Sequence, residues 1–363
     1  MKALVTKYLN IRTGVPAVEP DNNPNNLFYT PGETIDIAEP CFGETHRGNS
    51  IWYKLTDASY VWSGGVENGR PLFSLAEIDT DVSFWSTRFG FAALRAIVAD
   101  KLPQVRVSIL DTGIDERHPD LQGLNILKRY SAFTGSADQP ALGTTVDSHG
   151  HGTHCAAILF GSGNKRITGV AKGVAINVCK IMTRPGIGSG LSRQSILRAL
   201  KEVGNQSDVI SISAGIKGDD EALRTEIKAL ADSGVIIVAA IGNQVNGSGF
   251  AGYPAQYADC ISVGALNSSL DLSPNSFRFN NTDICFPGDN IVSAGLADKP
   301  DIYVADSGTS MATPFVAGLA AILKAHNPAI TVKEVRTKLL EWSELKTTGD
   351  FSYKSVRNQK LQL

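Results

Sequence analysis

The alternation of apolar runs with amphipathic segments after residue 100 constrains the fold of this chain most strongly. Apolar runs lie at 105–110, 174–182, 208–213, 235–241 and 260–266, and segments with helical periodicity lie between or after them at 151–160, 191–203, 221–233 and 309–326. Strands that are apolar almost throughout are typical of a parallel sheet covered by helices on both faces. We therefore predict an α/β fold with a parallel sheet sandwiched by helices.

The N-terminal part of the chain has a different pattern. Short strand-like pieces at 2–12, 33–40, 50–56 and 59–64 are separated by clusters of Pro, Asn and Gly, which favour turns. A chain of 363 residues is long enough for about two domains. We predict a small all-β barrel over 1–67, a linker over 68–84 and the α/β domain over 85–363.

Charge and cysteine content exclude several classes of protein. The 34 basic and 36 acidic residues nearly balance, which argues against binding to nucleic acid through phosphate attraction. No apolar run approaches the roughly 18 residues of a membrane span, and the first residues lack the apolar core of a signal peptide. The five cysteines form no CxxC pair, which makes a disulfide framework or a zinc site unexpected. We expect a cytoplasmic protein, or a secreted one if a signal peptide has been removed.

Polar residues stand where the predicted strands end and where two helices begin. Asp111, Ser213 and Asn243 follow apolar strands, and His151 and Ser310 stand at the start of helical segments. Ligands of parallel sheets bind at the carboxyl ends of the strands. One serine, one histidine and one aspartate can act as nucleophile, general base and orienting group, and a helix start offers free N–H groups to a developing negative charge.

Five segments together carry a family resemblance. DTGIDERHPDL (111–121), SHGHGTHCA (148–156), AAIGN (239–243), YPAQY (253–257) and SGTSMATPFVAG (307–318) resemble motifs of the subtilisin-like serine proteases, also called the subtilase family. The order Asp, His, Ser along the chain is that of subtilisin. The resemblance covers roughly residues 85 to 350 and implies a subtilisin-like fold.

The resemblance implies a role for four residues. Ser310 matches the nucleophile, His151 the general base, and Asp111 the carboxylate that orients the imidazole. Asn243 matches the side-chain donor of the oxyanion hole, which it shares with the backbone N–H of Ser310. Serine needs a base to take its proton, and the oxyanion of the tetrahedral intermediate needs donors that are already in place.

Substrate-binding positions are implied in the same way. Two segments match the walls of the groove that holds the peptide: Ser213, Ala214 and Gly215 on one side, and Gly188, Ser189 and Gly190 on the other. Gly252 stands where a bulky residue would fill the floor of the primary pocket. We expect a roomy, largely apolar pocket and a broad preference for apolar side chains.

The sequence also departs from the family pattern. Phe315 replaces a histidine that often follows the serine motif, and this replacement is expected to leave the catalytic residues intact. Asp120 matches a calcium ligand of the family, but the loop FGSGNKRITG (160–169) that would complete the site contains no carboxylate. Calcium needs several oxygen ligands. We therefore expect no metal site, with Asp120 as a weak calcium candidate, and no required cofactor.

The N-terminal segments LNIRTGVP (9–16) and WYKLTDASYVWSGGVE (52–67) resemble the bacterial type of Src-homology-3-like barrel. Domains of this type usually bind peptides or cell-wall components, so a ligand of that kind is an expected partner. The alternative is a folded appendage that only packs on the protease.

The predicted function is that of a serine endopeptidase that acts on protein or peptide substrates through an acyl-enzyme. One alternative is a ligase or cyclase that passes the same acyl group to an amine. The other is an inactive scaffold in which the barrel binds a partner.

Overall fold

The chain divides into two compact units, residues 1–81 and 82–363. The structure is a computed structural model, and it describes residues 2–4, 9–10, 28–29, 34–46, 49–57, 59–62, 82–133, 143–185, 190–245, 248–299 and 302–363. Among the described residues, none of the helices combines the length and the apolar character needed to cross a membrane.

The described part of the first unit consists of β-strands. Strands β1 (Lys2–Leu4), β4 (Thr34–His46), β5 (Asn49–Leu55) and β6 (Tyr60–Trp62) form an antiparallel sheet in that order, and β2 (Leu9–Asn10) pairs with β3 (Phe28–Tyr29). Trp52, Tyr53 and Val61 are buried in this unit. Four of these strands, β1, β2, β5 and β6, lie within a predicted strand-like piece or within one residue of it, β4 extends one by six residues, and β3 lies outside all of the predicted pieces. Closure into a Src-homology-3-like barrel stays a prediction.

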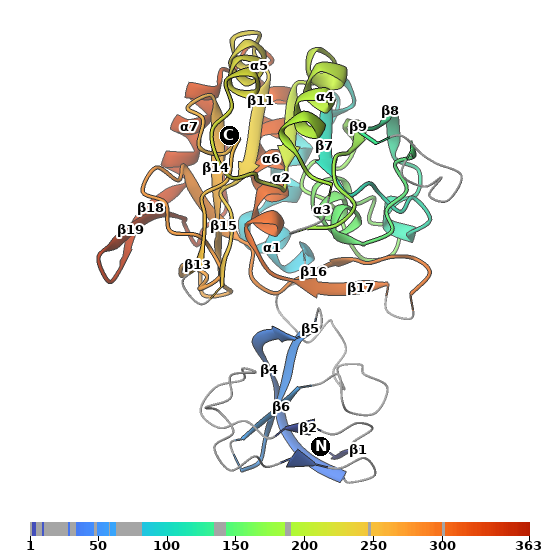
Figure 1. Ribbon diagram of the computed structural model, residues 1–363, viewed down its shortest axis with the longest axis vertical. Coiled ribbons are helices and arrows are strands. Elements are labelled where there is room, and N and C mark those ends of the chain that lie inside the picture. The colour runs from blue at the N-terminus through green and yellow to red at the C-terminus, as the bar shows by residue number, and fades with distance from the viewer. Residues whose placement is uncertain are drawn as a thin grey trace. The chain divides into compact units, whose positions relative to one another are not determined.

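The second unit is built on a nine-stranded sheet flanked by helices (Figure 1). The strand order is β18-β19-β15-β14-β11-β10-β7-β9-β8, and all neighbouring pairs are parallel except β18 with β19. The sheet strands are β7 (Arg106–Asp111), β8 (Asn125–Ser131), β9 (Ala175–Lys180), β10 (Val209–Ile212), β11 (Ile236–Ala240), β14 (Cys260–Leu266), β15 (Ile284–Pro287), β18 (Ser343–Thr348) and β19 (Phe351–Val356). This mostly parallel sheet confirms the predicted α/β class.

Seven α-helices, three short 3₁₀ helices (Leu102–Gln104, Pro119–Leu121 and Gly204–Gln206) and two small β-ribbons complete the described part of this unit. The helices are α1 (Val82–Phe89), α2 (Phe91–Ile97), α3 (His151–Phe160), α4 (Arg193–Val203), α5 (Glu221–Asp232), α6 (Thr309–His326) and α7 (Val332–Glu341). The ribbons pair β12 (Gln244–Val245) with β13 (Ser248–Gly249) and β16 (Ile291–Ala294) with β17 (Tyr303–Asp306). Helix α1 begins at Val82, inside the stretch predicted as a linker over 68–84.

Side chains alternate between two cores, one on each face of the sheet. In β7, Val107 and Ile109 belong to the core that contains α3 and α6, whereas Leu110 belongs to the core that contains α4 and α5. The strands are apolar almost throughout because both faces are covered. Because β7, β10 and β11 are parallel neighbours, the residues that end or follow them, Asp111, Ser213 and Asn243, lie at one edge of the sheet.

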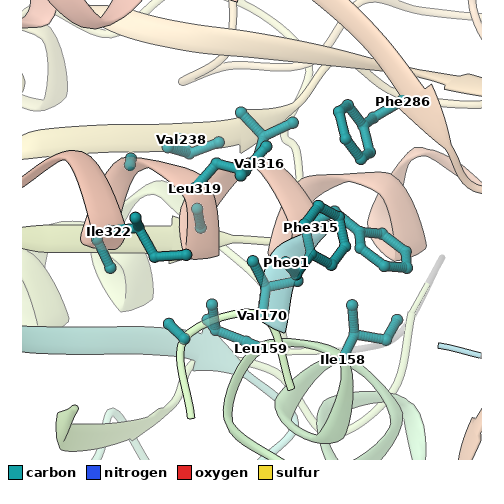
Figure 2. Close-up of a cluster of buried hydrophobic side chains, with 14 of the residues drawn as sticks. Phe91, Ile158, Leu159, Val170, Val238, Phe286, Phe315, Val316, Leu319 and Ile322 are labelled. Carbon is teal, nitrogen blue, oxygen red and sulfur yellow. The ribbon is translucent and has the colours of Figure 1, made fainter. Parts of the chain in front are cut away.

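Phe315, which replaces the histidine of the family pattern, belongs to an aromatic cluster. Phe315 of α6 is fully buried, and its ring centroid lies 6.1 Å from that of Phe91 and 5.8 Å from that of Phe286. Figure 2 shows Phe286 above Phe315 and Phe91, with Leu159 and Ile158 of α3 below the rings. Phe315 therefore serves packing of the hydrophobic core rather than catalytic chemistry.

Candidate active site

The Asp111 carboxylate and the His151 imidazole are in direct contact. Asp111 is the last residue of β7, and its Oδ1 lies 2.7 Å from Nδ1 of His151, the first residue of α3. Both side chains are buried. Burial opposes a positive charge on His151, but the charge and hydrogen bond of Asp111 outweigh it and raise the pKa of the imidazole above its ordinary value. The bond at Nδ1 leaves Nε2 as the nitrogen that can accept a proton.

The start of α3 reaches Asp111 because residue 152 has no side chain. A Cβ on Gly152 would lie 2.1 Å from the carbonyl oxygen of Gly113, a distance that no real contact permits. The same close approach lets the Gly152 N–H donate a hydrogen bond to Oγ1 of Thr112 at 2.8 Å. The glycine thus lets α3 begin against the turn that follows β7.

A second buried carboxylate, Asp147, holds this junction together. Its Oδ1 accepts hydrogen bonds from Oγ1 of Thr112 at 2.9 Å and from the N–H groups of His149 and Gly150. Its Oδ2 accepts from both the N–H and the Oγ1 of Thr153. Sequence reasoning missed Asp147 and Thr112, although an acidic residue just before a helix start is a signal for capping.

Ser310 lies in the first turn of α6, next to the end of β10. Its Oγ donates to the carbonyl oxygen of Ser213 at 3.2 Å, and its own carbonyl accepts from Oγ of Ser213 at 2.8 Å. The Sγ of Cys155 also lies 3.4 Å from the Ser310 carbonyl. Because Ser310 occupies the first turn, its backbone N–H has no partner within the helix.

The side-chain amide of Asn243 is held through its oxygen. Its Oδ1 accepts from the N–H of Thr309 at 2.9 Å and from Oγ1 of Thr309 at 3.0 Å. These two donors assign the orientation of the amide, so its NH₂ end is available for another acceptor. Sequence reasoning did not single out Thr309, the residue that sets this orientation.

A cavity of about 210 Å³ adjoins Ser310. Its lining residues are mostly apolar or small, and none of them is charged: Met182, Pro185, Leu191, Ser213, Ala214, Gly215, Ala240, Gly242, Asn243, Phe250, Gly252, Thr309 and Ser310. The predicted wall of Ser213, Ala214 and Gly215 and the predicted floor residue Gly252 all line it. Met182 and Phe250 were not predicted, although a phenylalanine inside the Gly-rich loop NGSGFAG is an unusual feature.

The opposite wall is only partly described. Gly188 and Ser189 lie outside the described residues. Gly190 has φ = 71°, and a Cβ there would lie 2.8 Å from the Phe133 ring. Gly190 does not line the cavity, whereas its neighbour Leu191 does.

Asp120, the calcium candidate, has its oxygens occupied by protein donors. Its carboxylate accepts from the N–H groups of Lys165 (2.7 Å), Arg166 (3.0 Å) and Ile167 (3.0 Å) and from Oη of Tyr303 at 2.6 Å. Burial opposes its charge, but the bonds from Tyr303 and the three amides keep the pKa of Asp120 below its ordinary value. The three amides and Tyr303 therefore occupy the Asp120 carboxylate, and a cation there would need further oxygen ligands.

Comparison with known proteins identifies the class that this fold and site define. The subtilase family matches residues 103–355, and the chain belongs to that family. The chain is 33% identical over 239 residues to subtilisin amylosacchariticus of Bacillus subtilis subsp. amylosacchariticus, and this match covers 65% of the chain and 59% of that protein. It is 33% identical over 277 residues to M-protease of Shouchella clausii, covering 74% of the chain and 68% of that protein.

Solved structures show the same fold. A cold-adapted subtilisin-like serine proteinase superposes with a TM-score of 0.58 at 26% identity, over 71% of this chain and 89% of that one. The prenylagaramide maturation protease PagA superposes with a TM-score of 0.60 at 24% identity, over 75% of this chain and 95% of that one. At that identity the second likeness concerns the fold alone.

Proposed function

We propose that the second unit is a subtilisin-type serine endopeptidase. The observation that carries this proposal is the contact of 2.7 Å between Asp111 and His151, with Ser310 at the start of α6 beside an uncharged cavity. The Oγ of Ser310 turns from the Ser213 carbonyl to Nε2 of His151, gives up its proton there and attacks the peptide carbonyl. Hydrogen bonds at such sites are often loose before substrate binds.

The remaining steps use the same residues. The developing oxyanion accepts hydrogen bonds from the Asn243 amide and from the Ser310 N–H, and His151 passes its proton to the leaving amine. Water then attacks the acyl-enzyme with His151 again as base, which releases the acid and frees Ser310. The Asp111 carboxylate stabilises the imidazolium in both steps.

A Ser310→Ala variant tests this proposal. Loss of the nucleophile lowers kcat roughly a million-fold in subtilisin. We expect wild type to be labelled covalently by a fluorophosphonate and to cleave peptides, and the variant to do neither while keeping its melting temperature. Cleavage by Ser310→Ala above about a thousandth of the wild-type rate would refute the assignment.

For specificity, we propose a broad preference for an apolar side chain before the cleaved bond. The cavity offers no charged group to a Lys or Arg side chain, and Met182, Leu191 and Phe250 supply apolar contact area. Incubation with an unbiased peptide library, read by mass spectrometry, reports the preference directly. A dominant acidic or basic residue at that position would contradict the proposal.

Two alternatives use the same chain differently. A ligase or cyclase would transfer the acyl group to an amine, and mass spectrometry of the products would show new peptide bonds in place of hydrolysed ends. An inactive scaffold would react with no fluorophosphonate. We favour hydrolysis because water reacts with an acyl-enzyme unless the site excludes it.

For cofactors, we propose that none is required and that calcium does not bind at Asp120, since three amides and a hydroxyl already use its oxygens. We expect EDTA to leave the melting temperature unchanged. A fall of several degrees that calcium reverses would return Asp120 to the list of ligands.

For the first unit, we propose a Src-homology-3-like domain that binds a peptide or cell-wall component and recruits substrate. A chain that starts near Asp81 is expected to keep its rates on small peptides and to cleave proteins more slowly. Faster cleavage of both substrate types would indicate that the unit blocks the groove instead.

For location, we propose the cytoplasm, because Cys155, Cys179, Cys260 and Cys285 are all unpaired and buried. Unpaired thiols are typical of reducing compartments. Detection of the protein mainly in the medium of cells that express the native gene would contradict this proposal.

A further inference from the structure

The outer edge of strand β18 lacks a neighbouring strand in the part of the chain that the structure describes. β18 stands at one end of the nine-stranded sheet and pairs there with β19 alone. Figure 1 shows the β18–β19 hairpin projecting from one side of the second unit. The unpaired edge of a strand presents a row of N–H and C=O groups to which a further strand can add.

The register of the hairpin decides which backbone groups of β18 face this outer edge. The N–H of Arg357 donates to the carbonyl oxygen of Trp342 at 2.8 Å, in register with the pairs of β18 and β19. Because hydrogen-bonded and non-hydrogen-bonded positions alternate in an antiparallel pair, the even-numbered residues of β18 direct their N–H and C=O groups to β19. Ser343, Leu345 and Thr347 therefore direct theirs to the outer edge. The Ser343 carbonyl accepts from Nε of Arg357 at 2.7 Å, and its second lone pair stays available.

The side chains of β18 are arranged symmetrically in charge around Leu345. This leucine is 73% exposed, more than any other large apolar side chain of the described residues. Glu344 precedes it and Lys346 follows it, so both project from the face of the sheet opposite to Leu345. Nζ of Lys346 lies 3.3 Å from Oδ1 of Asp271 and 3.8 Å from Oε1 of Glu344, which fixes the face on which the two charges lie. A half-turn about Leu345 exchanges the positions of the glutamate and the lysine, so the strand is complementary to itself.

One register of two antiparallel β18 strands satisfies both the backbone and the charges. When Leu345 faces Leu345 of a second copy, the two leucines exchange two backbone hydrogen bonds, and Ser343 exchanges two with Thr347 at either end. Glu344 then stands directly opposite Lys346 of the second copy, at the non-hydrogen-bonded positions where side chains come closest. A slip by one residue would set outward backbone groups against inward ones. A slip by two residues would set Glu344 against Glu344 or Lys346 against Lys346, which is unfavourable.

We propose that the outer edge of β18 is a homodimer interface, at which two copies of this chain pair their β18 strands antiparallel about a two-fold axis at Leu345. A second copy fits this edge because the sequence Glu-Leu-Lys is complementary to itself and each Leu345 covers the other. Strand addition at one edge buries less than the roughly 1,600 Å² of a standard interface, so we expect a dissociation constant of about 10–100 µM. The inference goes beyond the proposed protease function and does not depend on it.

Sedimentation velocity of the full-length protein over a concentration series tests for the dimer. We expect wild type to shift from the mass of one chain towards that of two as the concentration passes the dissociation constant. Leu345→Lys is expected to weaken the dimer at least about fivefold, because it sets two like charges opposite each other at the two-fold axis. Leu345 is exposed, so this variant is expected to keep the melting temperature of wild type.

Charge reversal tests the register of the two strands. Glu344→Lys and Lys346→Glu each turn two attractive pairs between the copies into repulsive ones, so each is expected to weaken the dimer at least about fivefold. The double variant restores opposite charges at both pairs and is expected to dimerise within about threefold of wild type. Glu221→Lys makes the first of these charge changes on an exposed residue of α5 and is expected to leave dimerisation unchanged.

A disulfide cross-link tests the same register directly. In the proposed dimer, residues 344 and 346 of different copies have Cα atoms about 4.5 Å apart, within reach of a disulfide, whereas the two residues 344 lie about 7–8 Å apart. A mixture of Glu344→Cys and Lys346→Cys keeps one glutamate–lysine pair in the mixed dimer. Under mild oxidation we expect the mixture to give a covalent dimer that contains both variants, and either variant alone to give less than about a tenth as much.

The remaining outcomes overturn the inference. Wild type that stays monomeric well above the expected dissociation constant would leave the edge to a strand of another protein. A wild-type dimer that persists unchanged in Leu345→Lys and in both charge reversals would place the interface elsewhere on the molecule. A double variant that dimerises no better than the single ones, or equal cross-linking of each cysteine variant with itself, would exclude the register.

Discussion

Gly215 and Gly252 face each other so closely that a Cβ on Gly252 would lie 2.9 Å from Cα of Gly215. The two segments are paired next to this contact, because Ile216 and Tyr253 exchange N–H to carbonyl hydrogen bonds of 3.0 and 2.9 Å. Both glycines line the cavity beside Ser310. Gly252 therefore does more than leave room in the cavity, because its lack of a side chain also allows the backbones of the two segments to come into contact.

A Gly252→Ala variant is expected to damage the cavity by pushing its wall. Overpacking of a closely packed site costs about 1–3 kcal/mol. If this strain falls on the substrate-binding wall, it corresponds to roughly a five- to 150-fold loss of kcat/KM on peptides with a large apolar residue before the cleaved bond. Peptides with alanine there are expected to lose less. Equal losses on both peptides would show that the methyl group disturbs Ser310 rather than the pocket.

Asn243→Ala is expected to lower kcat about 100- to 1000-fold with a nearly unchanged KM, because the amide serves the oxyanion of the transition state. Thr309→Val provides the matched control. It removes one of the two hydrogen bonds that orient Asn243 and keeps the N–H of Thr309, so the expected loss is smaller. A loss confined to KM in Asn243→Ala would make Asn243 a contact of the bound substrate.

The pair of His151 and Asp111 sets the pH dependence of activity. Asp111 and, to a lesser degree, Asp306 and Asp147 hold the pKa of His151 above its ordinary value of 6.5 despite its burial. The base must be neutral to accept a proton from Ser310, so kcat/KM is expected to rise with pH through a midpoint above 6.5. A pH profile of kcat/KM with its acid limb centred at or below 6.5 would contradict this.

Tyr303→Phe is expected to destabilise the protein at neutral pH. The depressed pKa of Asp120 contributes stability that is present above the unfolded value of about 3.9 and is lost as the pH falls through the lower, folded value. Loss of the Tyr303 hydroxyl removes a hydrogen bond to a charged group, typically about 1.5–3 kcal/mol. Urea unfolding measures the difference in unfolding free energy between wild type and Tyr303→Phe. This difference is expected to narrow as the pH falls towards about 2, where Asp120 is protonated in both proteins.

The pattern of apolar residues was sufficient to predict most of the sheet and the helices around it. The strands predicted at 105–110 and 260–266 and the helices predicted at 151–160 and 309–326 agree with β7, β14, α3 and α6 to within one residue at each end. The two strands are apolar almost throughout because both faces of the sheet are covered, and the two helices have ten or more residues, so local pattern and global fold agree. The short helices α1 and α2, separated by Gly90 at φ = 75°, offer no comparable period and were missed.

The sequence by itself determined which residues could form the site. Asp111, His151, Asn243 and Ser310 stand in extended motifs, and their order along the chain indicated the chemistry. Only the tertiary structure decided what surrounds them. The hydrogen bond from Thr112 to Asp147, the orientation of Asn243 by Thr309, and the occupation of Asp120 by loop amides and Tyr303 join residues from 35 to more than 180 positions apart. Such contacts form only when the sheet brings distant loops to one edge, and no local pattern of side chains encodes them.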